Sequence, residues 1–259
     1  MMNFAYLILP IALLLFPVTM IFLETGRCLG LRRLAHDPQG ARAGAGAVES
    51  AVFALFGLLI AFTFTGAASR YETRRDLIVR HANATGTAWL RLDLLPAEVQ
   101  PALRETFRLY VDGIIKVHRQ AGDRQAVDQT MARLAKLQNE IWGLAQSAVS
   151  RDSRPQVATL VLPALNEMFD LLTCRYATMR FHVSKVILGF LIFLSLLASL
   201  LAGYGMAFAK RRNWLHMIIF ALLVSLTLYV IFDFEYPRHG VIHLQEADYV
   251  YIELWKTMQ

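Results

Sequence analysis

Four long apolar segments, separated by stretches rich in charged residues, dominate the pattern of hydrophobic and polar positions along the chain. They cover about residues 4–23, 51–68, 183–209 and 214–232. A helix needs about 20 mainly apolar residues to cross the hydrocarbon core of a bilayer. The four segments therefore predict four membrane-spanning helices. The first is expected to be a retained span, because it has neither the basic start nor the cleavage site of a signal peptide.

The polar region at about 70–182 has a helical period. Its first helix carries apolar and small side chains at spacings of four, three, four and three residues: Ile78, Ala82, Thr85, Trp89 and Leu92. Such a stripe marks the buried face of a helix. Similar stripes predict helices at about 101–120 and 125–149, and a further helix that runs from residue 155 into the third span without a break. The fold class that follows is all-α, a four-span helical membrane protein with a helical extramembrane bundle inserted between spans two and three.

The same pattern divides the chain into four parts. These are 1–69 with spans one and two and their connecting loop, 70–182 with the bundle, 183–232 with spans three and four, and 233–259 with a C-terminal tail. The connection between the first two spans, at 24–50, is rich in Gly, Pro and Arg. Because Gly and Pro favour turns, we expect a loop there, with room for a short interfacial helix.

The charges of the short connections predict how the chain lies in the membrane. Basic residues in these two connections are Arg27, Arg32, Arg33, Arg42, Lys210, Arg211 and Arg212. Short loops with Lys and Arg usually stay in the cytoplasm, which places the bundle and both termini outside. Other basic residues flank the spans on the bundle side and oppose this orientation: Arg70, Arg74, Arg75, Arg175, Arg180 and Lys185. We expect a multi-pass protein of a bacterial inner membrane, with the balance of charges leaning toward an extracytoplasmic bundle.

Composition and motifs narrow the chemistry. The net charge of +6 suits contact with anionic lipid, and no basic stripe with motif support predicts nucleic-acid binding. The two cysteines, Cys28 and Cys174, have no CxxC or Cys/His spacing, and the sequence contains no nucleophile motif or phosphate loop. We therefore expect no metal, no cofactor and no enzymatic activity. A coupled pump is disfavoured too, because the centres of the spans lack Asp, Glu, Arg and His.

Small side chains recur at every fourth position in spans two and three. The predicted helix-packing positions are Gly57, Ala61, Ser69, Ser195, Ser199 and Gly203. Small residues let two helices approach closely, although the same stripe could line a pore in an oligomer. Rings of Phe or Ile gate some pores by dewetting. The candidate pore-lining or gate residues are Phe56, Ile60, Thr63, Phe64 and Thr65.

Charged residues crowd the point where span two leaves the membrane. They are Arg70, Glu72, Arg74, Arg75 and Asp76. Pairing within the helix is the first interpretation, for example between Asp76 and Arg80 four residues further on. The three arginines could instead bind lipid headgroups or, as a third interpretation, attract anions to a pore mouth.

The stretch at 57–96, GLLIAFTFTGAASRYETRRDLIVRHANATGTAWLRLDLLP, resembles the signature of a bacterial membrane protein family called bestrophin-like, whose function is largely unknown. His81 stands where that signature has an acidic residue, and Thr85 stands where it has Ile. Weaker similarity extends over most of the chain. The name implies a comparison with bestrophins, which are pentameric anion channels with four spans, a helical domain between spans two and three, and a pore lined by span two. Their acidic calcium clasp has no recognisable counterpart in this sequence.

The pattern and the resemblance lead to two functional hypotheses. The first is a passive ion channel for anions, with span two near the pore of a homo-oligomer; the comparison with bestrophins implies a pentamer. The alternative is a membrane-embedded sensor or scaffold whose helical bundle binds a partner. The expected partners are membrane lipids and further copies of the chain, and nucleic acid is not among them.

Overall fold

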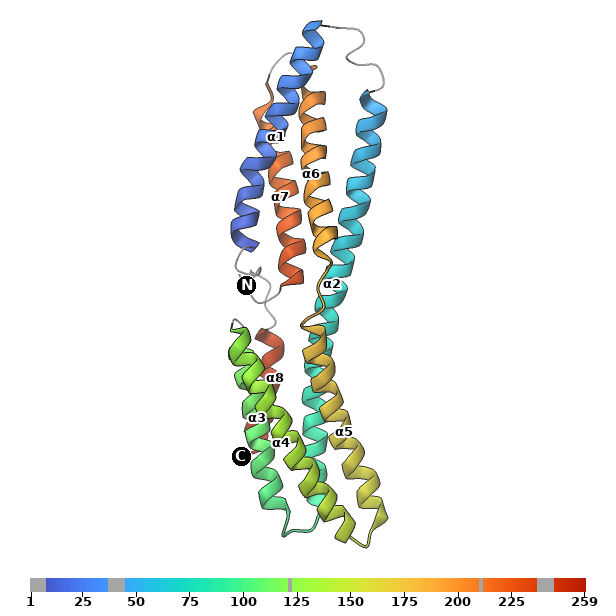
Figure 1. Ribbon diagram of the computed structural model, residues 1–259, viewed down its shortest axis with the longest axis vertical. Coiled ribbons are helices and arrows are strands. Elements are labelled where there is room, and N and C mark those ends of the chain that lie inside the picture. Colours follow the sequence, from blue (N-terminus) through green and yellow to red (C-terminus); the bar gives the residue numbers. More distant parts are fainter. Residues whose placement is uncertain (1–7, 37–44, 121–122, 210–211, 237–244) are drawn as a thin grey trace. The chain divides into compact units, whose positions relative to one another are not determined.

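The computed structural model describes residues 8–36, 45–120, 123–209, 212–236 and 245–259. Within these ranges the chain is all-α, as predicted, with eight α-helices, one short 3-10 helix and no strand (Figure 1). The elements are α1 (Ile8–His36), α2 (Ala45–Arg91), η3 (Leu92–Leu94), α3 (Gln100–Arg119), α4 (Arg124–Arg151), α5 (Pro155–Thr178), α6 (Lys185–Met206), α7 (Trp214–Glu235) and α8 (Gln245–Thr257).

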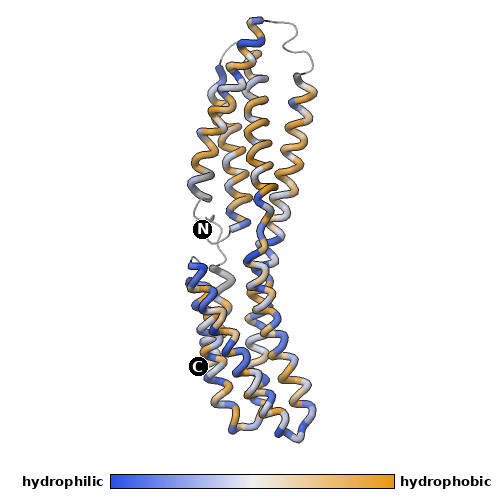
Figure 2. Tube along the Cα trace, in the orientation of Figure 1, coloured by the Kyte–Doolittle hydropathy of each residue, from blue (hydrophilic) through white to orange (hydrophobic). Residues whose placement is uncertain are grey.

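Five of the described helices are long and apolar enough to cross a membrane, namely α1, α2, α5, α6 and α7. Figure 2 shows apolar residues along α1, α6, α7 and the first half of α2, whereas the second half of α2 mixes polar and apolar residues. Several apolar helices of this length fit an integral membrane protein. Four of them match the predicted spans, and α5 is an additional candidate that the sequence pattern placed in the bundle.

The chain divides into two compact units that alternate along the sequence. Unit 1 comprises Met1–Tyr71 and His182–Ile242, and unit 2 comprises Glu72–Phe181 and His243–Gln259. The first boundary falls inside α2, which has 47 residues. A helix of that length extends for about 70 Å, roughly twice the hydrocarbon thickness of a bilayer. One continuous helix therefore supplies an apolar half to unit 1 and a polar half to unit 2.

Helices α1, α6 and α7 pack together in unit 1, and α1 crosses α6 at two glycines. A Cβ atom at Gly26 would lie 1.9 Å from the carbonyl oxygen of Leu200, and one at Gly203 would lie 1.9 Å from the carbonyl oxygen of Leu23. The two backbones are thus in direct contact, an approach that glycine permits and larger residues prevent.

The loop predicted at 24–50 is wrong where the structure describes it, because α1 includes 24–36 and α2 includes 45–50. The residues between these two helices lie outside the described residues. Glycine suggested a turn in this segment, but Gly26 and Gly30 instead lie within α1 and let it approach α6. The same residue type that breaks a helix in water can serve as a contact surface between membrane helices.

Unit 2 is a bundle formed by the polar half of α2 with α3, α4, α5 and α8. The stripe predicted at 78–92 lies on α2 and the first residue of η3, and it is confirmed, because all of its positions are buried: Ile78, Ala82, Thr85, Trp89 and Leu92. The inward face of α3 is buried as well, with Leu103, Phe107, Tyr110 and Ile114. Helix α8, which lies within the predicted C-terminal tail, packs against α3 and buries Tyr251 completely.

The predicted continuous helix from residue 155 into the third span is wrong. Helix α5 ends at Thr178, and α6 begins at Lys185 after Ser184, whose side chain accepts a hydrogen bond from the backbone N–H of Val186 at 3.3 Å. Such a residue is a helix N-cap. The apolar pattern continues across this point, but hydropathy does not register the backbone groups that end one helix and start the next.

Candidate functional site

The apolar half of α2 is the least covered of the candidate spans. Only 17% of the residues in its most apolar stretch are buried, against 28% in α1 and 39% in α5, α6 and α7. The small side chains of Gly57, Ala61, Thr65 and Ser69 are exposed. At Gly57 a Cβ atom would have no neighbour within 4 Å among the described atoms. This face of α2, which we call the small-residue face, has no helix of unit 1 packed closely on it at Gly57.

The residues predicted to line or gate a pore fall on different faces of α2. Phe56 is buried in the core of unit 1, and Ile60 packs against that core. Thr63 is buried, and its hydroxyl donates a hydrogen bond to the carbonyl of Leu59 at 2.7 Å. Phe64 meets the ring of Phe234 edge-on, with ring centroids 5.6 Å apart. Thr65 is the member of the set that lies on the exposed small-residue face. A pore-lining or gating role stays a prediction for all five residues.

The predicted packing residues of the third span lie inside unit 1. Ser195 and Ser199 are fully buried, and their hydroxyls donate to the carbonyls of Ile192 and Ser195, each at 2.7 Å. Their polar groups are therefore satisfied within α6. Gly203, further along the same helix, forms the crossing with α1.

Each arginine of the charged exit has a different environment. Arg74 is buried, and its guanidinium donates to the backbone carbonyls of Thr178 at 3.4 Å and Phe181 at 2.8 Å. It therefore binds one backbone carbonyl at the end of α5 and one in the segment that follows it. Arg75 is exposed and lies 3.9 Å from Glu72.

Pairing within the helix, the first interpretation of these charges, is confirmed for Asp76 and Arg80, whose charged atoms are 3.6 Å apart. Both side chains are well exposed. A surface pair of this kind contributes little to stability. Among the charged residues where α2 leaves the apolar segment, Arg74 is therefore the one whose contacts stabilise unit 2.

Arg70 binds a buried carboxylate that the sequence did not single out. Its guanidinium lies 3.0 Å and 2.9 Å, by Nε and Nη2, from Oε2 of Glu235 at the end of α7. The other oxygen of Glu235 accepts from the backbone N–H of Val183 at 2.6 Å and lies 3.5 Å from His182 Nδ1. The carboxylate is fully buried, so these contacts replace the hydration that burial removes.

A second buried polar cluster lies in the core of unit 2 around His81 of α2. The Nδ1 atom of His81 is 2.6 Å from the hydroxyl of Tyr251 in α8 and 3.2 Å from Nη1 of Arg175 in α5. The Nε2 atom is 3.1 Å from the hydroxyl of Tyr110 in α3. Arg175 also contacts the hydroxyl of Tyr251 and Nε2 of His118. Four helices thus meet at one group of hydrogen bonds.

The donors of this cluster assign its protons. A guanidinium only donates hydrogen bonds, so Nδ1 of His81 is an acceptor and the imidazole is neutral. Nε2 then carries the proton and donates toward Tyr110, an assignment that rests on the hydrogen-bond network. Arg175 is buried, and none of its described hydrogen-bond partners is a carboxylate. The positive charge of Arg175 is therefore stabilised by neutral hydrogen-bond acceptors.

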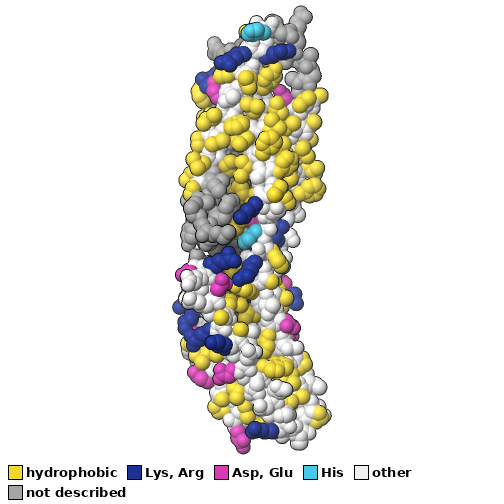
Figure 3. All heavy atoms as spheres, viewed as in Figure 1, with side chains coloured by type: hydrophobic (Ala, Val, Ile, Leu, Met, Phe, Trp, Pro, Cys, Tyr) yellow, Lys and Arg dark blue, Asp and Glu magenta, His cyan; other side chains and the backbone are white. Residues whose placement is uncertain are grey.

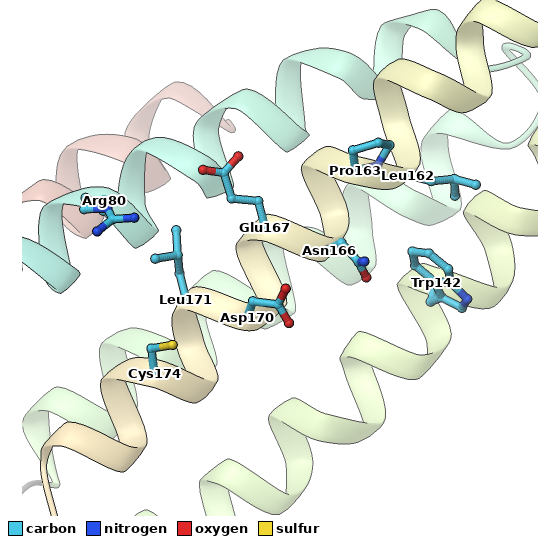
Figure 4. A pocket seen from close by; sticks show the side chains of 9 residues that line it. All are labelled: Arg80, Trp142, Leu162, Pro163, Asn166, Glu167, Asp170, Leu171 and Cys174. Atoms are coloured by element: carbon cyan, nitrogen blue, oxygen red, sulfur yellow. The ribbon is translucent and has the colours of Figure 1, made fainter. Parts of the chain in front are cut away.

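The outer face of α5 carries an open groove of about 610 Å³ (Figure 4). Most of its lining comes from α5, including Glu167, Asp170 and Cys174, while Arg80 comes from α2 and Trp142 from α4. Cys174 is a free, exposed thiol. No group of three or more metal-ligating side chains occurs among the described residues. The groove therefore offers a mixed surface of acid, base and apolar groups on the outside of unit 2.

Comparison with known proteins gives one match. The bestrophin-like domain family matches residues 24–249, which include the candidate spans from within α1 onward and nearly all of unit 2. No curated protein and no solved structure matches the chain. The family match agrees with the resemblance that the stretch at 57–96 predicts.

Proposed function

Because the chain belongs to the bestrophin-like domain family, we propose that it is a passive ion channel, conducting anions as a homo-oligomer with α2 near the pore. The observation that supports this most directly is the small-residue face of α2, which is exposed at Gly57, Ala61 and Thr65. In a bilayer, small residues usually mark the surface where one helix meets another. In this proposal the α2 helices of neighbouring copies meet along this face around a common axis.

The chemistry of α2 suits passive conduction rather than pumping. Its stretch at 51–68 contains no Asp, Glu, Lys, Arg or His, so it offers no group for proton relay or charge coupling. The exposed hydroxyl of Thr65 would face the axis and offer a polar group to a permeating ion or its water. Hydrophobic side chains on both sides of it could form a dewetting constriction.

The proposed architecture has four spans, formed by α1, α2, α6 and α7, with the helices of unit 2 as an extramembrane bundle inserted between spans two and three. We assign α5 to the bundle because it carries Glu167, Asp170 and Arg175 near its middle and end, and charged groups are costly in lipid. The same proposal includes domain boundaries after residues 69, 182 and 232, a location in a bacterial inner membrane, an extracytoplasmic bundle and a pentameric assembly. We propose no catalytic role.

Conductance of the purified protein in planar bilayers tests the channel. We expect current in chloride solutions, and a Thr65→Cys variant in a background with Cys28→Ser and Cys174→Ser should lose current when an anionic thiol reagent is added. Leu222→Cys is the matched control, because Leu222 is exposed on α7 and has no place on the small-residue face. Absence of current in every salt tested, or equal block of both variants, would contradict the proposal.

The alternative, a sensor or scaffold whose bundle binds a partner, has its own support in the groove on α5. The groove is open and carries acidic, basic and aromatic side chains together, as protein-binding surfaces often do. Membrane lipids remain the proposed partner of Arg75, which is exposed, whereas Arg70 and Arg74 are engaged inside their own units. A protein that conducts no ions but retains a partner through the groove would support this alternative.

A further inference from the structure

The exposed face of α2 continues beyond the apolar half of the helix. A helix turns by about 100° per residue, so residues seven or eleven positions apart lie within about 20° of each other around its axis. Glu72 and Asp76 come seven and eleven residues after Thr65. Their side chains are 66% and 61% exposed. The side of α2 that carries the Thr65 hydroxyl therefore carries two acidic groups just beyond the apolar half.

The basic residues of the same stretch lie in other directions. Arg75 is about 80° around the helix from Thr65, and Arg80 is about 60° from it on the opposite side. Arg70 and Arg74 are engaged within their own units, by a buried carboxylate and by backbone carbonyls. The direction of Thr65 is thus acidic, although the stretch as a whole contains more arginine than acidic residues.

Each of the two carboxylates has an arginine nearby on the helix surface, but both pairs are loose. Glu72 lies 3.9 Å from Arg75, and Asp76 lies 3.6 Å from Arg80. Ion pairs between exposed side chains are weak, because water and salt screen both charges. The two arginines therefore offset the negative charges only partly on the side of the helix where the carboxylates lie.

The two acids stand where the surface changes from apolar to charged. In Figure 3, hydrophobic side chains cover most of the visible face of unit 1, whereas acidic and basic side chains are interspersed on unit 2. Within α2, residues 51–69 contain no charged side chain, and Glu72 is the first acidic residue after them. An ion that enters or leaves the apolar stretch at this end would therefore meet these carboxylates first.

We infer that Glu72 and Asp76 determine the ion selectivity of the proposed channel and weaken its preference for anions. The inference rests on the proposed function, in which Thr65 faces a common axis and every copy contributes the same face of α2. Symmetry then repeats the two carboxylates around the mouth of the pore. Rings of Asp and Glu attract cations, whereas rings of Arg and Lys attract anions. The acidic residues, rather than the arginines, thus set the charge of this mouth.

Reversal potentials of the purified protein in planar bilayers, under a gradient of sodium chloride, test the inference. We expect the double variant Glu72→Gln/Asp76→Asn to raise the ratio of chloride to sodium permeability roughly sevenfold, because a change of about 1 kT in the potential at the mouth raises the local concentration of chloride and lowers that of sodium by the same factor. The rise should be smaller at high salt, because the Debye length falls from about 10 Å at 0.1 M to about 3 Å at 1 M.

Two further variants separate charge from structure. Glu72→Asp keeps the charge and should keep the wild-type permeability ratio. Glu105→Gln in α3 is the matched control, because Glu105 is also 66% exposed and also has an arginine three residues further on, Arg108 at 3.5 Å. It removes the same charge away from α2 and should leave the ratio unchanged.

The outcomes distinguish this inference from the proposed function. Absence of current in the wild type would contradict both together. Current with the same permeability ratio in the wild type and in the double variant would overturn the inference alone. A rise of the ratio in Glu105→Gln as large as that in the double variant would overturn it as well, because the effect would then not depend on the α2 face.

Discussion

At the scale of single residues, the tyrosine hydroxyl that α8 inserts into unit 2 is a main acceptor for the buried Arg175. Replacing Tyr251 by Phe removes this acceptor and leaves the shape of the core unchanged. A hydrogen bond to a charged group contributes about 1.5–3 kcal/mol to stability. We therefore predict that Tyr251→Phe loosens α8 and speeds amide hydrogen exchange in this helix, roughly tenfold for every 1.4 kcal/mol lost.

Tyr249→Phe is the matched control for this measurement, because it makes the same chemical change in the same helix at a side chain that is 63% exposed. Exchange in α8 should not change in this variant. If Tyr251→Phe also leaves the exchange of α8 at the wild-type rate, the hydroxyl does not hold the helix in place.

A second residue-scale prediction concerns pH. The hydrogen bond from Tyr176, together with the charges of Arg180 and Arg124, lowers the pKa of Asp128 below its ordinary value of 3.8. A carboxyl group whose pKa is lower in the folded state stabilises the fold above its unfolded pKa, and this contribution is lost as the pH falls through the folded pKa. The ion pair with Arg180, at 3.3 Å, is lost with it.

We therefore predict that the thermal midpoint of the wild type exceeds that of Asp128→Asn near neutral pH, and that the gap closes as the pH falls below about 3.8, the ordinary pKa. Tyr176→Phe should show the same narrowing, because it removes the main cause of the pKa shift. Midpoints in detergent at pH 6 and at successively lower pH give the gap directly. A gap that stays constant down to the lowest pH at which the protein folds would contradict the assignment.

Only part of the polar cluster around His81 could be predicted from the sequence. Sequence reasoning noted His81 as a departure from the family signature and predicted a helix with a buried stripe at about 101–120, which includes Tyr110. It used Arg175 only as a charge flanking a span and gave no role to Tyr251. The reason is distance along the chain, because the hydrogen bond between His81 and Tyr251 joins residues 170 positions apart. Periodicity reports which face of a helix is buried, and it carries no information about which distant polar group that face will meet.

At the scale of elements, the crossing of α1 and α6 depends on the missing side chain of Gly203. A Cβ atom there would collide with a backbone carbonyl, which cannot rotate away as a side chain can. Overpacking a tight contact typically costs about 1–3 kcal/mol. We predict that Gly203→Ala lowers the thermal midpoint of the purified protein clearly below that of the wild type.

Gly189→Ala is the matched control, because Gly189 lies in the same helix and has open space where the new methyl group would go. It should leave the midpoint unchanged. Similar midpoints for the two variants would show that the helices can separate at Gly203 without loss of stability.

Elements with a strong period could be predicted, whereas their ends and partners could not. The stripes at 78–92 and on α3 correctly gave buried helix faces, because burial in a bundle follows the helical repeat. The apolar run that suggested one helix through α5 and α6 hid a break. At this break Ser184 caps the start of α6, and Arg74 binds the carbonyls of Thr178, at the end of α5, and of Phe181, after it. These are local polar contacts, and hydropathy is insensitive to them.

At the scale of the whole molecule, the two native cysteines can report which side of the membrane each part occupies. Both are free and exposed, with Cys28 in α1 and Cys174 on the outer face of α5. If the bundle is extracytoplasmic, as proposed, a membrane-impermeant maleimide should label Cys174 in intact cells and Cys28 only after lysis. Single variants, Cys28→Ser and Cys174→Ser, identify the labelled site. The reverse pattern would place the bundle in the cytoplasm.

The alternation of the two units has a consequence for the order in which the protein is made. Unit 2 begins with the polar half of α2 but is completed by α8, and α6 and α7 are synthesised between them. During translation Arg175 cannot form its hydrogen bond with the hydroxyl of Tyr251 until both of these apolar helices have left the ribosome. The last helix thereby makes completion of the bundle depend on synthesis of the segment before it, and until then the core of unit 2 is exposed, a state in which chains are prone to aggregate.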